Sequence, residues 1–227
     1  MAVYALGDLH LPFGRDRSME IFGDAWRDYT RRIERNWTRL VGPEDTVVVA
    51  GDLCWAMDLD EAEPDFRWLA ALPGRKLLLK GNHDYYWTGL SKMRRFLAEK
   101  GIGGVDFLHN ASVTADGLSL CGTRGWCPEA AEEGTVYARE LGRLRASLAA
   151  AEHPDRRVCF LHYPPVGRGF DCPEIRAILS EFGVRRCYYG HLHGPSLGGA
   201  FRGEADGVRY ECISADGADF TPRLVRD

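Results

Sequence analysis

Side chains that can bind metal ions recur at five places along the 227-residue sequence. Each place is a short polar group that follows an apolar, strand-like run and contains aspartate, asparagine or histidine. The groups are Asp8-Leu9-His10, Gly51-Asp52, Gly81-Asn82-His83-Asp84, His162 and Gly190-His191-Leu192-His193. Together they offer carboxylate, amide and imidazole donors, and this mixture of oxygen and nitrogen suits two adjacent divalent metals. A structural zinc site would instead favour thiolates.

Each group has an ordinary structural explanation when it is taken alone. A lone histidine is more often a surface or core residue than a ligand, Gly-Asp is usually a turn, and Asp84 could simply cap the helix that follows it. The coincidence favours a site, because five of the seven histidines fall inside these groups and motifs gain meaning from their structural context. His109 and His153 lie outside the pattern and are expected to be structural.

The composition is that of an ordinary globular domain, with 45% hydrophobic and 27% charged residues. The formal net charge of −4 provides no global basic field, so stable nucleic-acid binding is not expected. No apolar run approaches the roughly 20 residues that span a bilayer, and the first residues lack the features of a signal peptide. Seven scattered cysteines predict free thiols rather than a disulfide framework. These features predict a cytoplasmic protein without a membrane partner.

Strand-like and helix-like segments alternate along the chain without repeats or linkers, which predicts a single domain over residues 1–227. Strands are expected over residues 3–6, 46–50, 77–80, 105–108, 112–114, 118–122, 158–161 and 186–189. Helices are expected over residues 22–40, 63–72, 89–100 and 175–182, with a further helix that carries Tyr137, Leu141, Leu144 and Leu148. Beyond residue 200, turn residues predict hairpins at 205–207 and 215–217.

This arrangement explains why the polar groups recur as they do. In open α/β sheets, ligand sites lie beyond the carboxyl ends of the strands, and each of the five groups falls at such an end. The inferred fold class is α/β, with two sheets packed face to face and helices on the outside.

In order and in residue type, the five groups match the pattern of the calcineurin-like metallophosphoesterase superfamily, which is D-x-H, G-D, G-N-H-D/E, H and G-H-x-H. The resemblance covers residues 8–193. It implies a two-sheet β-sandwich flanked by helices in four layers. It also implies a metal-dependent phosphoric ester hydrolase, a phosphatase or phosphodiesterase that acts by attack of a metal-bound hydroxide. The alternative is a non-catalytic metal-binding interaction scaffold with the same fold.

Residue by residue, the resemblance implies two metal sites that share Asp52 and a separate acid. The first metal would be held by Asp8, His10, Asp52 and His193. The second would be held by Asp52, Asn82, His162 and His191. His83 would assist the leaving group, with Asp84 orienting its ring. Manganese or iron is expected at these sites, with zinc and nickel as the alternatives.

Substrate contacts are expected from residues near the ligand groups. Arg124 and Trp126 follow a strand, and Arg168 follows His162 by a few residues. Arginine favours phosphate and an aromatic ring can stack on a base or sugar, although such aromatics often only pack loops. Leu53-Cys54-Trp55 lacks the Asp-Arg of serine/threonine phosphatases, which argues against a phosphoprotein substrate. The expected partner is a phosphorylated small molecule or nucleotide; the sequence predicts no oligomeric state.

Overall fold

The computed structural model describes residues 1–126 and 134–226. Over these residues the strands form two large sheets and one small hairpin, Val166–Gly167 (β8) with Phe170–Asp171 (β9). The first sheet has the order β13-β1-β2-β3-β4, with strands Arg223–Leu224, Val3–Leu6, Thr46–Val49, Arg75–Leu78 and Val105–Phe107. The second has the order β11-β12-β10-β7-β6-β5, with strands Gly203–Ala205, Val208–Cys212, Arg186–Tyr189, Arg157–Leu161, Leu118–Thr123 and Ser112–Ala115.

The centre of each sheet is parallel. Strands β1 to β4 run parallel to their neighbours, as do β6, β7, β10 and β12, and antiparallel strands lie only at the described edges. All four residues of Thr46–Val49 are buried. A β-branched run of this kind is expected where both faces of a parallel sheet are covered.

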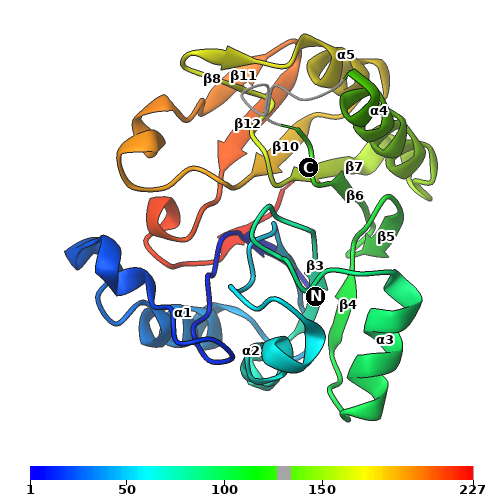
Figure 1. The fold of residues 1–227 in the computed structure, drawn as a ribbon. Helices are drawn as coiled ribbons and strands as arrows, with labels where there is room; N and C mark the ends of the chain where they lie inside the picture. Colours follow the sequence, from blue (N-terminus) through cyan, green and yellow to red (C-terminus); the bar gives the residue numbers. More distant parts are fainter. Residues whose placement is uncertain (127–133, 227) are drawn as a thin grey trace.

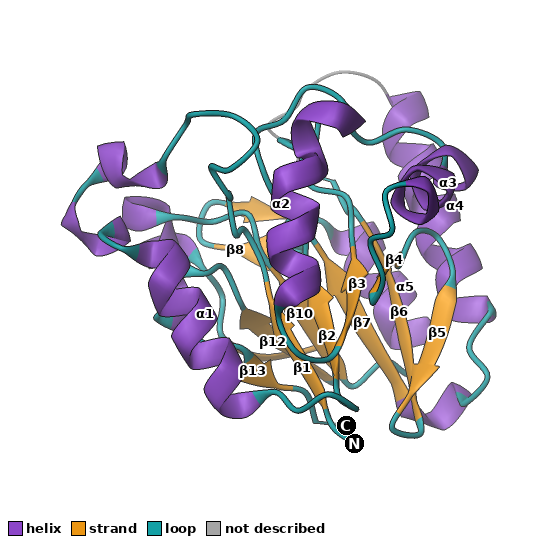
Figure 2. Cartoon of the chain, turned by 90° about the horizontal axis from the view of Figure 1, so that it is seen from below, coloured by secondary structure: helices purple, strands orange, loops and turns teal. Residues whose placement is uncertain are grey.

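Helices cover the outer face of each sheet, which gives four layers (Figure 1). Tyr29–Leu40 (α1), Leu59–Ala71 (α2) and Leu90–Glu99 (α3) share a core with the first sheet. Gly134–Ala149 (α4) and Pro173–Glu181 (α5) share a core with the second. Figure 2 shows α1 and α2 in front of the first sheet. The predicted fold class, two sheets flanked by helices, is confirmed.

The strand period of two separates these cores. Val47 and Val49 face the helices of the first layer, whereas Val48 faces the other sheet. In β7, Phe160 faces the first sheet and Leu161 faces α4 and α5. Because successive side chains alternate between faces, both sheets are apolar on each side. The strands of the two sheets end at one edge of the sandwich.

One predicted helix is shorter in the structure. The amphipathic spacing predicted a helix over residues 22–40, but α1 begins at Tyr29. Two short 3-10 turns, Met19–Phe22 (η1) and Asp24–Trp26 (η2), precede it. The break has a backbone cause, since Gly23 has φ 118° and Asp28 has φ 51°, and neither value fits an α-helix.

The start of helix α2 and the predicted turn at 215–217 also differ from the prediction. Helix α2 begins at Leu59 rather than residue 63, because the Asp58 carboxylate accepts the Glu61 N–H at 2.9 Å and caps the first turn. The predicted hairpin turn at 205–207 is confirmed between β11 and β12. The predicted one at 215–217 is wrong, since Asp216–Ala218 is a 3-10 turn (η5) that leads the chain from the second sheet back to β13 in the first.

The cysteines that the structure describes are all buried and free. In the same part of the chain, no helix is both long enough and apolar enough to cross a membrane.

Candidate metal centre

The polar groups of the sequence meet at the edge where the two sheets present their carboxyl ends. Asp8, Asp52 and Asn82 follow β1, β2 and β3 of the first sheet. His162 follows β7, and His191-Leu192-His193 follows β10, both in the second sheet. The site is therefore built from both halves of the sandwich.

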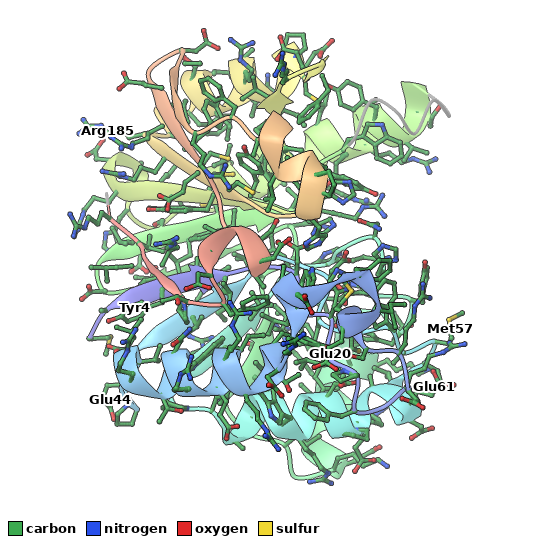
Figure 3. All side chains as sticks on the ribbon, turned by 90° about the vertical axis from the view of Figure 1, so that its left-hand side faces the viewer. Tyr4, Glu20, Glu44, Met57, Glu61 and Arg185 are labelled. Atoms are coloured by element: carbon green, nitrogen blue, oxygen red, sulfur yellow. The ribbon has the colours of Figure 1, made fainter. Side chains whose placement is uncertain are left out.

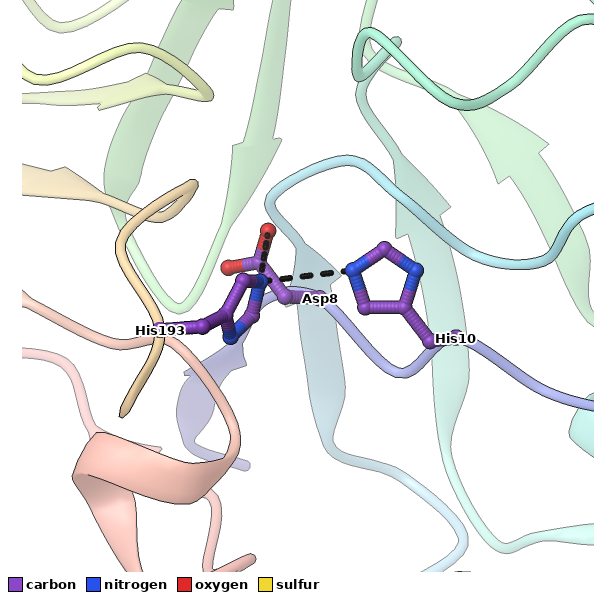
Figure 4. A group of neighbouring side chains, drawn as sticks. All are labelled: Asp8, His10 and His193. Carbon is purple, nitrogen blue, oxygen red and sulfur yellow. Dashed lines mark hydrogen bonds and ion pairs between the residues drawn. The ribbon is translucent and has the colours of Figure 1, made fainter. Parts of the chain in front are cut away.

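The first cluster contains Asp8, His10 and His193 (Figure 4). Nε2 of His10 lies 3.3 Å from Nε2 of His193, which lies 3.5 Å from Oδ1 of Asp8. Two ring nitrogens and a carboxylate oxygen thus point at one small volume. This convergence suits a cation, because each nitrogen can offer its lone pair to the same ion.

The second cluster brings an amide oxygen to two imidazoles. Oδ1 of Asn82 lies 2.7 Å from Nε2 of His162 and 2.9 Å from Nδ1 of His191. The other nitrogen of His162 lies 3.0 Å from the carbonyl oxygen of Ala50. Since that nitrogen donates its N–H to the carbonyl, Nε2 is left with a lone pair, as a metal ligand requires.

Asp52 lies between the two clusters. Its Oδ2 is 3.7 Å from Nε2 of His10 and 3.6 Å from Nε2 of His162. Its Oδ1 accepts the backbone N–H of His83 at 2.8 Å. One carboxylate oxygen therefore faces histidines of both clusters.

The charges of the site fit bound cations. Burial, followed by the Asp8 carboxylate, raises the pKa of Asp52 well above its usual range. Burial also opposes the ionisation of Asp8, but the nearby His193, His162 and His10 outweigh it, so the pKa of Asp8 lies below its usual range. Two buried carboxylates this close repel each other unless positive charge lies between them. The oxygen and nitrogen donors present are those that bind divalent metals.

Asp216 is a neighbour of the first cluster that the sequence analysis did not include among the candidate site residues. Its Oδ1 lies 3.2 Å from Nδ1 of His193, and its Oδ2 accepts the N–H of Gly194 at 2.8 Å. Burial disfavours a charged His193, but Asp8 and then Asp216 raise its pKa to about 10. A carboxylate behind a metal-facing histidine fixes the ring and raises its basicity. The available signal was that Asp216, like the ligand groups, follows a strand end, at Cys212.

His10 is held in a different way. Its Nδ1 is buried and has no hydrogen-bond partner among the described residues. The ring instead stacks on Trp55, with centroids 4.6 Å apart and planes at 23°. The guanidinium of Arg17 also lies over Trp55, 4.0 Å from its centroid. Arg17 is thus a cation beside the site that the sequence analysis did not single out.

His83 lies at the edge of the clusters and is half-buried. Its ring centroid is 5.6 Å from that of His10 and 4.5 Å from that of Trp55, and its Nδ1 is 3.2 Å from the Tyr85 hydroxyl. Burial, then His162 and Arg17, lowers the pKa of His83 to about 4. His83 therefore lies beside the first cluster with a pKa that favours the neutral ring.

Asp84 has partners other than the one expected. The resemblance implied that it orients His83, but its carboxylate accepts the backbone N–H groups of Asp52 at 2.9 Å, Leu53 at 2.8 Å and Gly81 at 2.7 Å. No hydrogen bond joins Asp84 to the His83 ring in the part of the chain that the structure describes. Burial, followed by Asp52, raises the pKa of Asp84 to about 7. Asp84 therefore ties the loop after β2 to the loop after β3.

The backbone is strained where it presents the ligands. Asp8, His10, Asp52 and His191 have φ values of 60°, 45°, 52° and 74°. Left-handed conformations at residues other than glycine cost about 1–3 kcal/mol each and cluster at functional sites.

Two glycines let the ligand loops approach closely. A Cβ at Gly81 would overlap the carboxylate of Asp52, and a Cβ at Gly190 would overlap the carboxylate of Asp8. The glycines of the sequence groups are therefore required by contact with the ligands themselves.

The expected substrate contacts lie in two places. The carbonyl oxygen of Arg124 accepts the N–H groups of His162 at 3.0 Å and Tyr163 at 2.9 Å, which places its loop beside the second cluster. The Arg124 guanidinium lies 5.6 Å from the ring centroid of Trp126 and 5.8 Å from that of Tyr163. Arg168 is exposed on the turn between β8 and β9. A substrate role for these residues stays a prediction.

Comparison with known proteins agrees with the fold. A family model described as calcineurin-like phosphoesterase matches residues 1–195, so the chain belongs to that family.

The gene 66 protein of Mycobacterium phage L5 is 34% identical over 79 residues, which is 34% of this chain and 37% of the phage protein, little more than a third of that relative's length. Two solved structures share the fold. A protein of unknown function from Aquifex aeolicus has TM-score 0.57 at 19% identity, and the alignment covers 98% of this chain and 95% of the Aquifex chain. A phosphopantetheinyl hydrolase from Mycobacterium tuberculosis has TM-score 0.58 at 15% identity, and the alignment covers 99% of this chain and 95% of the hydrolase chain.

Proposed function

We propose that this protein is a phosphoesterase that uses two divalent metals to hydrolyse phosphomonoesters or phosphodiesters of small molecules or nucleotides. The observation that carries the proposal is the position of Asp52, whose single Oδ2 faces His10 at 3.7 Å and His162 at 3.6 Å. A carboxylate oxygen shared in this way suits two neighbouring cations, because the negative charge between them offsets their repulsion.

The residues divide between the metals as their distances suggest. Asp8, His10, Asp52 and His193 would hold the first, and Asp52, Asn82, His162 and His191 the second. When bound, a pair of divalent metals supplies an activated water and neutralises the charge on the phosphoryl oxygens. The donor set suits manganese or iron, with zinc and nickel as alternatives.

The proposal is tested by replacing one second-cluster ligand and one histidine outside the site. We expect manganese-loaded protein to hydrolyse para-nitrophenyl phosphate, bis(para-nitrophenyl) phosphate, or both. Asn82→Ala should lose nearly all of this turnover and one metal, because Asn82 contributes the oxygen between two imidazoles. His153→Ala is the matched control and should keep both. Which ester is hydrolysed faster distinguishes a phosphatase from a phosphodiesterase.

Two results would contradict the proposal. Unchanged turnover in Asn82→Ala would show that the clusters are not the active site. Two bound metals without hydrolysis of any ester in a broad panel would favour the alternative, a metal-binding interaction scaffold with the same fold.

His83 is the residue that we assign to the leaving oxygen. It lies beside the first cluster, but its nitrogens are outside the groups that converge there, so the N–H of its neutral ring can donate a hydrogen bond to the oxygen when the P–O bond breaks. Arg17, over the neighbouring Trp55, adds a positive charge on the same side.

His83→Ala should keep both metals and lose rate by about 10²–10⁴-fold, the usual contribution of a positioned acid. The loss should be greater for alkyl esters than for para-nitrophenyl esters, which leave readily as anions. Elemental analysis and turnover of both ester types measure this. Loss of a metal, or an equal loss of rate on both types, would assign His83 a different role.

A further inference from the structure

A pocket of about 310 Å³ opens beside the first cluster. Three of its lining residues are histidines of the site, namely His10, His83 and His193. The others are Met19, Phe22, Trp26, Trp55, Gly194 and Pro195. Its volume lies at the lower end of the range of about 300–1,000 Å³ that is usual for small-molecule sites.

The lining of the pocket is mostly apolar. Among the described residues, its lining includes no aspartate, glutamate, lysine or arginine, and its polar side-chain atoms are those of the three imidazoles and two indoles. Two of the imidazoles already face each other across 3.3 Å in the first cluster. The Trp55 Nε1 is shielded from solvent. Little in this lining can replace the water that surrounds sugar hydroxyls or a second phosphate, so burying such groups here would be unfavourable.

The outer wall comes from the 3-10 turns that interrupt the predicted first helix. Trp26 is fixed by edge contacts to Tyr29 and Phe220, with centroids 5.4 and 5.2 Å apart. Phe22 stands at the mouth, with 60% of its surface exposed. Its neighbour Ile21 is 73% exposed but does not line the pocket. Figure 3, in which Glu20 is labelled, shows this segment on the face toward the viewer.

We propose that this pocket binds the alcohol portion of the substrate and selects phosphoesters whose leaving group is aromatic or alkyl rather than a sugar. The inference rests on the proposed function. Because His10, His193 and His83 line the pocket, a group that fills it is joined to the phosphorus that reacts. Because His83 is assigned to the leaving oxygen, the group that fills the pocket is the alcohol that leaves. In the hydrolysis, water adds to phosphorus, the P–O bond breaks, and the apolar alcohol leaves with the oxygen and a proton.

The test compares three primary alkyl phosphates of similar intrinsic reactivity: 2-phenylethyl, ethyl and glycerol phosphate. We expect kcat/KM of the manganese-loaded protein to be at least about 10-fold higher for the phenylethyl ester, as apolar pockets usually discriminate by 10-fold or more. Phe22→Ala should reduce the ratio of phenylethyl to ethyl turnover several-fold. Ile21→Ala, which changes an exposed neighbour outside the pocket, should leave the ratio unchanged.

A binding measurement separates this inference from the proposed function. With metals removed by a chelator, 2-phenylethanol should quench tryptophan fluorescence in the parent protein and in Ile21→Ala, and should do so more weakly in Phe22→Ala. If no ester is hydrolysed but the alcohol binds in this way, the proposed function fails and the pocket stands. Equal kcat/KM for the three esters, or equal behaviour of the two variants, would overturn the inference. Circular dichroism checks that both variants fold.

Discussion

At the scale of the residue, three of the histidines in the two clusters are oriented by different kinds of neighbour. His162 donates to the Ala50 carbonyl and His193 to the Asp216 carboxylate, whereas the ring of His10 stacks on Trp55. In the proposed metal centre, these partners would decide which nitrogen faces the metal and how firmly the ring is held, and the loss of such a partner typically weakens metal binding.

Asp216 should therefore control the affinity of the first metal. We expect Asp216→Ala to weaken manganese binding by about 10–100-fold, the usual effect of losing such a partner. Competition with a fluorescent chelator measures it. Asp219→Ala is the matched control, because Asp219 is exposed and pairs with Arg32 away from the clusters. Equal affinities in the two variants would show that the contact between Asp216 and His193 does not matter.

The hydrogen bonds of Asp84 predict a loss of stability rather than only a loss of rate. Asp84→Ala leaves three buried backbone N–H groups without their acceptor. Each such group costs about 1–3 kcal/mol, so the free energy of unfolding should fall by at least about 3 kcal/mol. Urea unfolding of metal-free protein measures this. If Asp84→Ala unfolds at the same urea concentration as the parent but hydrolyses esters more slowly, Asp84 would instead orient the His83 ring, as the resemblance implied.

Residue types and order predicted the ligand groups, because each group is local in sequence and follows a strand. The contacts that orient them could not be predicted in the same way. Asp216 meets His193 from 23 positions away, and Trp55 meets His10 from another loop. Only the fold brings such residues together.

At the scale of the element, strands were easier to predict than helix ends. The buried β-branched run at Thr46–Val49 identifies its strand directly. The start of α1 was not visible, because the apolar spacing continues through Gly23 and Asp28, whose backbone conformations break the helix. The residues before α1 instead form the outer wall of the apolar pocket.

A buried carboxylate on α2 predicts a pH dependence of stability. Asp65 accepts the N–H of Phe13 at 2.9 Å and of Gly14 at 3.2 Å, and burial raises its pKa to about 6. Between pH 4 and 6 the unfolded chain loses this proton while the folded chain keeps it. Stability should therefore fall as pH rises through this window, by at most about 3 kcal/mol, and then level off.

Asp65→Asn removes the titrating group and tests whether Asp65 causes the pH dependence of stability. Urea midpoints of metal-free protein at pH 4.5 and 7 should differ less in the variant than in the parent. An equal change in urea midpoint between pH 4.5 and 7 in both proteins would mean that titratable groups other than Asp65 cause the pH dependence.

At the scale of the whole molecule, the site joins the two sheets. Asp8, Asp52 and Asn82 come from the first, and His162, His191 and His193 from the second. The sequence predicted this convergence, because strand ends in such sheets share an edge. It could not predict what covers that edge, since η5 was taken for a hairpin turn and the turns before α1 for helix.

Metal binding should consequently stabilise the sandwich as a unit. A ligand that binds only the folded state adds about 4 kcal/mol when its concentration is 1,000 times its dissociation constant. For a chain of this size that corresponds to a rise in Tm of about 8–16 °C. We expect manganese to produce this shift in the parent and in His153→Ala, and a chelator to reverse it. Asp52→Ala should lose more than half of the shift, because Asp52 faces both clusters. Full metal occupancy without a change in Tm would mean that the unfolded chain binds manganese as tightly as the folded protein does.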